Sequence, residues 1–225
     1  MRIFFRVAIA ALAVGAVSVA GPVQAGLVMT ISDNQGNTVT VNGSQPGGPG
    51  TDLVANFSGN LGGVTIAVSV GDSNSPSLTD PVRLSTNILV SGGTAPAGDI
   101  ITVAVTDNGV TFPTGSNLTL TSSAATNPAG NATTTYQSSA AGTSTSVQTT
   151  NGVVSTPIAG TVSSPYTITG TTTLAFAAGT PSASVANALE VTAVPEPGSV
   201  IVWSLVACSL GLPGLNRRRQ ACGTS

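Results

Sequence analysis

Seven acidic side chains are the main source of possible chemistry in the central part of this chain. A glycosidase needs two facing carboxylates, whereas Ca²⁺ binds to clustered carboxylate and amide oxygens. Six of the seven lie in predicted turns or at strand ends, where Asp commonly forms turns and caps, so we expect no catalytic pair. A hydrolase using carboxylates alone is the least favoured alternative. The acids between positions 26 and 194 are Asp33, Asp52, Asp72, Asp80, Asp99, Asp107 and Glu190.

Two short segments offer oxygen ligands that could suit calcium. They are Asp72-Ser73-Asn74 and Asp107-Asn108. Neither matches the full Asp-x-Asp-x-Asp-Gly pattern of a calcium-binding loop. Asp72, Asn74 and Asp107 are therefore weak calcium candidates, and we predict no bound metal and no other cofactor.

The composition excludes several classes of function. The chain has no histidine and no lysine, and both cysteines, Cys208 and Cys222, lie near its C-terminal end. Ser-His-Asp and Cys-His catalytic sites and a His/Cys zinc site cannot be assembled from these residues. Between positions 26 and 194, Arg83 stands alone against seven acids, which gives a net charge of −6. A basic groove for nucleic acid is therefore excluded, and we predict a protein that is not an enzyme.

Alternation of apolar and polar residues predicts an all-β body. Such a period of two, with many β-branched residues, is typical of half-buried antiparallel strands. The predicted fold is an antiparallel β-sandwich or jelly-roll-like domain over residues 26–193. The clearest segments are Leu27–Ser32, Thr38–Asn42, Val64–Val70, Val82–Val90 and Ile101–Thr106, and further strands are expected around Leu118, Ile168, Leu174 and Leu189.

Turn residues and one polar stretch complete this prediction. Asp33–Asn37 is expected to close a first hairpin, and Asp107-Asn108-Gly109 offers the conformations of a tight turn. Residues 184–188 are expected to form a turn at most. The Thr/Ser-rich stretch 122–164 holds few large apolar residues, which indicates either polar outer strands or partial disorder. Tyr136 and Tyr166 are the aromatic residues that could be exposed to stack on sugars.

The N-terminal segment is typical of export. Arg2 and Arg6 precede the apolar run 7–20, and Val23 and Ala25 are small residues at the positions that a signal peptidase reads. We therefore predict a signal peptide over residues 1–25, with cleavage after Ala25.

The C-terminal segment has three parts in a fixed order. Pro195-Glu196-Pro197 is followed by the uncharged apolar run 200–215, and then by Arg217, Arg218 and Arg219. The run predicts a single, short transmembrane helix. The arginine cluster would keep the chain end in the cytoplasm.

This arrangement resembles the PEP-CTERM sorting signal of exopolysaccharide-producing bacteria. The resemblance covers residues 194–219 and leaves 220–225 as a cytoplasmic tail. It implies that Pro195, Glu196 and Pro197 are recognised by an exosortase, a membrane transpeptidase, and that Arg217 to Arg219 retain the tail. It also implies a transient stay in the inner membrane, then release to the cell surface or extracellular space, with exopolysaccharide as a further candidate partner. An ordinary C-terminal anchor with an accidental Pro-Glu-Pro is the alternative.

We therefore predict an exported, non-enzymatic surface or matrix protein. A carbohydrate- or calcium-binding adhesion module of the same β fold is the alternative function.

Overall fold

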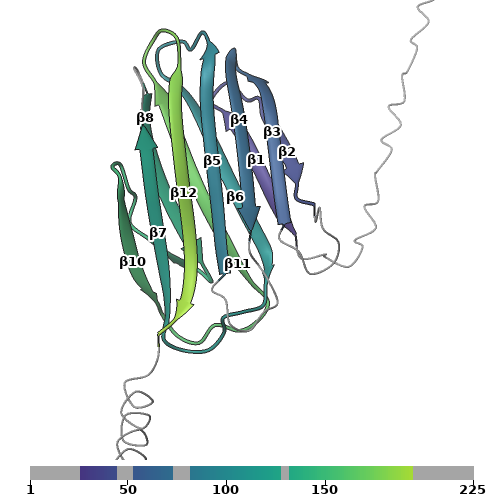
Figure 1. Ribbon diagram of the computed structural model, residues 1–225, viewed down its shortest axis with the longest axis vertical. Helices are drawn as coiled ribbons and strands as arrows, with labels where there is room; N and C mark the ends of the chain where they lie inside the picture. Colours follow the sequence, from purple (N-terminus) through teal and green to yellow (C-terminus); the bar gives the residue numbers. More distant parts are fainter. Residues whose placement is uncertain (1–25, 45–52, 73–81, 128–131, 195–225) are drawn as a thin grey trace, which may run out of the picture.

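The computed structural model describes residues 26–44, 53–72, 82–127 and 132–194 (Figure 1). The predicted signal peptide and the whole of 195–225 lie outside these residues. The described strands, in chain order, are β1 Leu27–Asp33, β2 Thr38–Asn42, β3 Leu53–Leu61, β4 Val64–Asp72, β5 Val82–Gly93, β6 Asp99–Val110, β7 Leu118–Asn127, β8 Ala132–Ala140, β9 Thr143–Ser144, β10 Gly152–Ile158, β11 Tyr166–Phe176 and β12 Ser182–Ala193.

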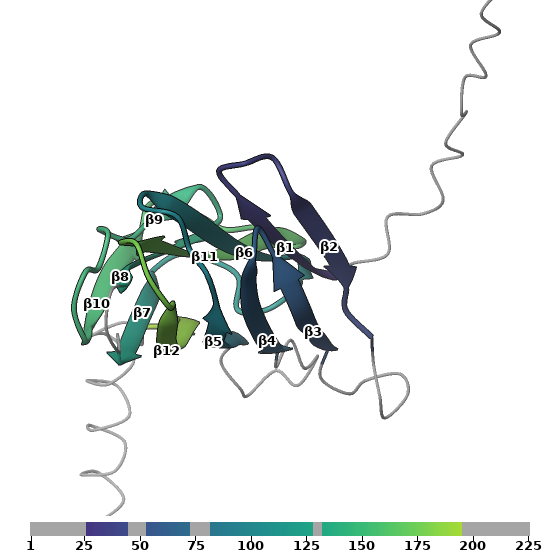
Figure 2. The same ribbon diagram turned by 90° about the horizontal axis from the view of Figure 1, so that it is seen from above.

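The strands form two antiparallel sheets that pack face to face, as Figure 2 shows from one end. Sheet A has the order β2-β1-β6-β11-β8-β9, and sheet B has the order β10-β7-β12-β5-β4-β3. No helix occurs among the described residues. The predicted all-β, antiparallel, sandwich-like architecture is therefore confirmed for this part of the chain.

The core follows directly from the alternation in the sequence. In β6, Ile101, Val103 and Val105 are at most 1% exposed, whereas the residues between them lie on the outer surface. Full burial of one such side chain stabilises a fold by about 1.5–3 kcal/mol. The two inner faces together bury large side chains from both sheets, among them Leu27, Met29, Ile31, Ile66, Leu84, Ile88, Leu120, Ile168, Leu174 and Leu189.

The expected turn at Asp107-Asn108-Gly109 is wrong. These residues lie inside β6, where the register against β11 shifts between Tyr166 and Ile168. The Asp107 carboxylate accepts a hydrogen bond from the Gly109 N–H at 2.9 Å, and Asn108 Oδ1 accepts one from the Gly26 N–H at 3.0 Å. These turn-forming side chains thus form hydrogen bonds at an irregularity within a strand. The sequence alone cannot distinguish such an irregularity from a chain reversal.

The backbone hydrogen bonds test two further predictions, one for residues 184–188 and one for the Asp33–Asn37 hairpin. Residues 184–188, expected to form a turn at most, lie within β12, which is hydrogen-bonded to β5 on one side and to β7 on the other. The Asp33–Asn37 hairpin is confirmed, because the Asp33 N–H donates to the Asn37 carbonyl at 3.0 Å and its carboxylate accepts from the turn. Pairing with neighbouring strands therefore overrides a weak local preference for a turn at 184–188, whereas the strong turn preference of Asp33–Asn37 is retained in the fold.

Much of the Thr/Ser-rich stretch 122–164 lies in the strands β7 to β10. The short β9 and the strand β10 lie at sheet edges, as polar outer strands would, but β7 and β8 lie inside their sheets. Inward Ser138 of β8 donates from Oγ to Ser122 Oγ of β7 at 2.9 Å, and buried Gln148, between β9 and β10, donates from Nε2 to the same Ser122 Oγ at 2.6 Å. These bonds offset the cost of burying polar groups. A polar inner layer thus replaces part of the apolar core.

Candidate functional site: the outer faces of the two sheets

The outer face of sheet A carries rows of hydroxyl side chains. The strand register places outward residues of β2, β1, β6, β11 and β8 side by side. The rows are Thr38, Ser32, Thr102, Thr173 and Thr135; Thr40, Thr30, Ala104, Thr171 and Gln137; and Asn42, Val28, Thr106, Thr169 and Ser139. We call these three rows the hydroxyl face. Neighbouring side chains are about 4.8 Å apart across strands and about 6.8 Å apart along them.

The side chains of the hydroxyl face are partly accessible to solvent and partly covered by one another. Thr38 and Thr40 are exposed, and the threonines of β1, β6 and β11 in these rows are half-buried by their neighbours. Thr106 Oγ1 and Thr169 Oγ1 lie 3.2 Å apart and share a hydrogen bond. The remaining hydroxyls present a repeated pattern of one methyl and one oxygen for each threonine.

No charged side chain points outward from the three rows. Among the described acids of sheet A, Asp99 and Asp107 face the interior and are 2% and 0% exposed. Asp33 lies at the end of β1, where Asn37 Nδ2 donates to its carboxylate at 2.6 Å and holds its pKa below the usual value. The hydroxyl face is therefore uncharged although the body as a whole is acidic.

Local sequence explains why threonine can occupy this face. In β11, Ile168, Leu174 and Phe176 face the core, and the intervening positions 169, 171 and 173 are threonine. Threonine is β-branched and fits a pleated, half-buried surface. Sequence reasoning missed the hydroxyl face, although a period of two in threonine, opposite apolar residues, was a visible signal.

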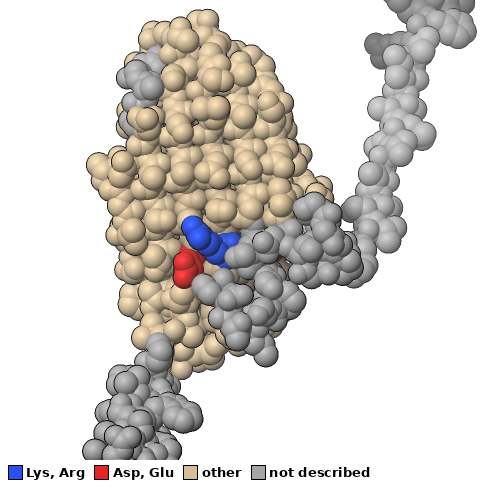
Figure 3. Space-filling view, viewed as in Figure 1, with Lys and Arg blue, Asp and Glu red and all other residues tan. Residues whose placement is uncertain are grey.

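The outer face of sheet B is different in character. A shallow hollow of about 770 Å³ is lined largely by small side chains, and its walls include Arg83 and Val153. Arg83 lies opposite Glu190 across β5 and β12. Figure 3 shows this face as almost free of charge, apart from one cluster of basic and acidic side chains in its lower half. Small residues in the hollow include Gly71, Ser85, Ser123, Ala124, Ala186 and Ala188.

The structure does not bring the calcium candidates together. Asp72 ends β4 in sheet B, whereas Asp107 is buried in β6 of sheet A. Asn74 lies outside the described residues. Within residues 26–44, 53–72, 82–127 and 132–194, no group of three or more Asp, Glu, His or Cys side chains is placed to hold a metal ion.

The residues predicted to direct sorting and processing lie outside the described part of the chain. Ala25 precedes the described part of the chain, and Pro195, Glu196, Pro197 and Arg217, Arg218 and Arg219 follow it. The part of the chain that the structure describes contains no helix long and apolar enough to cross a membrane.

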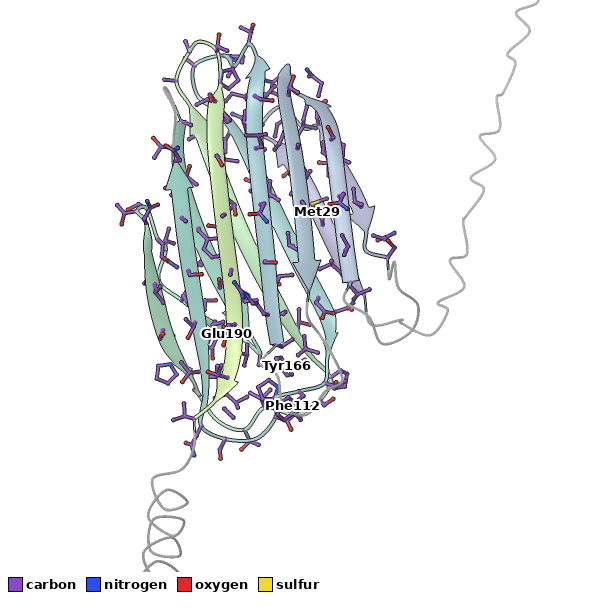
Figure 4. The ribbon with its side chains drawn as sticks, in the orientation of Figure 1. Met29, Phe112, Tyr166 and Glu190 are labelled. Atoms are coloured by element: carbon purple, nitrogen blue, oxygen red, sulfur yellow. The ribbon has the colours of Figure 1, made fainter. Side chains whose placement is uncertain are left out.

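The two tyrosines are not available for stacking on sugars. Tyr136 is 3% exposed and Tyr166 is 7% exposed, so the expectation that they could be exposed is wrong. Both face inward on sheet A, and Figure 4 marks Tyr166 toward the lower end of the sandwich. Burial raises the pKa of Tyr136 to about 12, against an opposing hydrogen bond with Ser138. Burial, and secondarily the negative charge of Asp107, raises the pKa of Tyr166 well above its usual value.

These buried phenols predict loss of stability in alkali. An unfolded tyrosine ionises near pH 10 and a buried one ionises later, so the stabilisation is complete below pH 10 and is lost as the pH rises through the folded pKa. Ionisation of Tyr136 alone should lower the free energy of unfolding by about 2 kcal/mol by pH 12. The chain has no lysine that would titrate in the same range. Melting temperatures from pH 8 to pH 12 should fall above pH 10, in step with tyrosinate absorbance.

Tyr136→Phe supplies the control for this prediction. It should flatten the decline between pH 10 and pH 12 while leaving an alkaline transition from Tyr166. An equally steep decline in a variant with both tyrosines replaced by phenylalanine would show that other groups cause it.

Comparison with known proteins gives no further guide, since no protein-family model, no curated protein and no solved structure matches this chain.

Proposed function

We propose that this chain is an exported, non-enzymatic protein of the cell surface or extracellular matrix, released by exosortase-type processing at Pro195-Glu196-Pro197. Support comes from the order of its segments. A signal-peptide pattern precedes the fold, and the Pro-Glu-Pro, apolar and arginine segments follow it. The β-sandwich lies between the two predicted processing points.

One structural observation carries this proposal. The first strand begins at Leu27 and the last ends at Ala193, so neither cut removes any part of a described strand. The flanking residues are also held to the fold, because the Gly26 N–H donates to Asn108 Oδ1 at 3.0 Å and the Val194 N–H donates to the Asn117 carbonyl at 2.8 Å. A chain cut at both points would keep both sheets whole.

The test is the intact mass of the protein recovered separately from culture medium and from membranes. We expect a medium form that begins at Gly26, ends near 195–199 and lacks Arg217 to Arg219. Replacing Pro195, Glu196 and Pro197 together by alanine should move the protein from the medium to the membrane fraction. Glu190→Gln, which changes an acid within the fold, serves as the control and should be released normally. A membrane form that keeps the arginines in the unaltered protein would contradict the proposal.

A second function, binding of carbohydrate, is favoured by the hydroxyl face. Calcium binding has no comparable support, because Asp72 and Asp107 belong to different sheets. Stacking of sugars on Tyr136 or Tyr166 is not supported either, because both rings are buried.

A further inference from the structure

We propose that the hydroxyl face of sheet A binds a neutral, flexible polysaccharide chain by hydrogen bonding and methyl contacts, without aromatic stacking and without metal. This inference rests on the proposed extracellular location, which gives the protein access to such polymers. The proposed ligand binds one face of the sandwich and is an uncharged glycan.

The hydroxyl face offers the same hydrogen-bonding groups as a sugar. The row Thr38, Ser32, Thr102, Thr173 and Thr135 places one hydroxyl on each of five neighbouring strands. A threonine hydroxyl both donates and accepts a hydrogen bond, as a sugar hydroxyl does. The adjacent methyl group offers an apolar contact for the C–H groups of a sugar ring. Each threonine therefore offers a sugar both a hydrogen-bonding group and an apolar contact.

The lack of charge on the hydroxyl face favours a neutral ligand. None of the outward residues in the three rows is charged, and the acids of β6 point inward. An acidic polymer would find no counter-charge on this face and would be repelled by a body of net charge −6. A basic polymer would find no carboxylate among the same outward residues. The complementary partner is therefore uncharged.

The shape of the hydroxyl face and the weakness of single hydrogen bonds favour a long, flexible ligand. Strands in a sheet are twisted relative to one another, so the three rows follow a curved surface rather than a plane. A flexible polymer can follow such a curved surface. A rigid, flat ligand such as a crystal face cannot contact all three rows at once. Each hydrogen bond to the ligand replaces one to water and contributes only about 0.5–1.5 kcal/mol. Useful affinity must then come from many contacts along one polymer, and we expect weak binding to short oligosaccharides.

Sheet B provides an internal comparison. Its outer face also carries cross-strand threonines, and Thr119 pairs with Thr192 across β7 and β12. That face includes the oppositely charged neighbours Arg83 and Glu190 and many small residues instead of threonine rows. A substitution there alters a threonine pair of the same kind without touching the hydroxyl face.

The experiment measures retardation of the exported protein, expressed from the full chain, in gels containing a soluble neutral glucan or acidic alginate. Thr102→Val with Thr173→Val removes two neighbouring hydroxyls of one row and keeps the β-branched shape. Thr119→Val with Thr192→Val is the matched control. Melting temperatures establish that both double variants remain folded.

We expect retardation by dextran or hydroxyethylcellulose, unchanged between low and high salt, and none by alginate. The Thr102/Thr173 variant should bind about thirtyfold more weakly, because two hydrogen bonds of about 1 kcal/mol each are lost. The control should bind as the unaltered protein does. Should the Thr102/Thr173 pair fail to fold, Thr171→Val takes its place, with an expected loss of about fivefold.

Four results would overturn the proposal: no retardation by either neutral glucan, equal loss in the two double variants, salt-sensitive binding to alginate alone, or self-association that the Thr102/Thr173 variant abolishes. The last would assign the face to a second copy of this chain. Because the assay uses whichever exported form is recovered, its result does not depend on whether the C-terminal segment is cut.

Discussion

Gly93→Ala should destabilise the sandwich by more than about 3 kcal/mol, because the added methyl group has no room and the backbone conformation is unsuited to alanine. Gly93 has a φ of +97°, and its added Cβ would collide with the carbonyl oxygen of Gly63 and lie 3.0 Å from the Cα of Val64. The obstructing atoms are backbone atoms that cannot rotate away. The register between β4 and β5 shifts at this point, between Val64 and Ile66, so relief would require β4 to move.

The adjacent glycine separates the two causes. Gly92 has a φ of +106°, and nothing lies within 4 Å of the position that its Cβ would take. Gly92→Ala should therefore lose only the strain of a positive φ, about 1–2 kcal/mol. Urea unfolding of both variants gives the difference directly. Equal losses at the two positions would mean that the contact with Gly63 is relieved by local movement and that backbone strain alone matters.

The alternation of side chains made the strands predictable. Each of the clear apolar-polar segments falls within a strand, and the single long strand expected over Val82–Val90 is β5, Val82–Gly93. The alternation arises because one face of each strand is buried. It can therefore be recognised from residues that are close together in the sequence. The hairpin at Asp33–Asn37 was predictable for the same reason, since its hydrogen bonds join residues close in the chain.

The hydroxyl face was not predictable in the same way. Thr102 lies beside Thr173, and Ser32 beside Thr102, only because β6 pairs with β11 and with β1, which are far apart in the sequence. A period of two shows that these side chains share a face with their own strand neighbours, but it does not show which strands adjoin. The rows exist only once the register is known.

The errors at Asp107 and the tyrosines share this cause. Asp107-Asn108-Gly109 has the composition of a turn, yet β11 pairs with β6 both at Asp107 and beyond the segment at Val110. Tyr136 lies in a polar segment that gives no local sign of burial, and the pairing of Thr172 with Tyr136 places it in the interior. Burial of an aromatic residue in a polar strand depends on what the opposite sheet places against it.

A chain that ends at Val194 should have the same melting temperature as the full-length protein, whereas a chain that ends at Pro181 should not fold. The longer form keeps every described strand. The shorter form lacks β12, which lies between β5 and β7 in sheet B and buries Val185, Leu189 and Val191. Those three side chains alone contribute about 1.5–3 kcal/mol each.

The loss of β12 also removes the backbone hydrogen bonds along both of its edges and exposes the interior edges of β5 and β7. Together these losses match or exceed the total stability of about 5–15 kcal/mol that a domain of this kind has. Circular dichroism and thermal melting of the two forms would measure the contrast. If the form ending at Val194 melted much lower than the full chain, residues beyond 194 would be part of the fold, and cutting there could not release an intact protein. An unchanged melting temperature would instead mean that a cut after Val194 does not destabilise the fold, because the proposed sorting segment would follow a sandwich that is already complete.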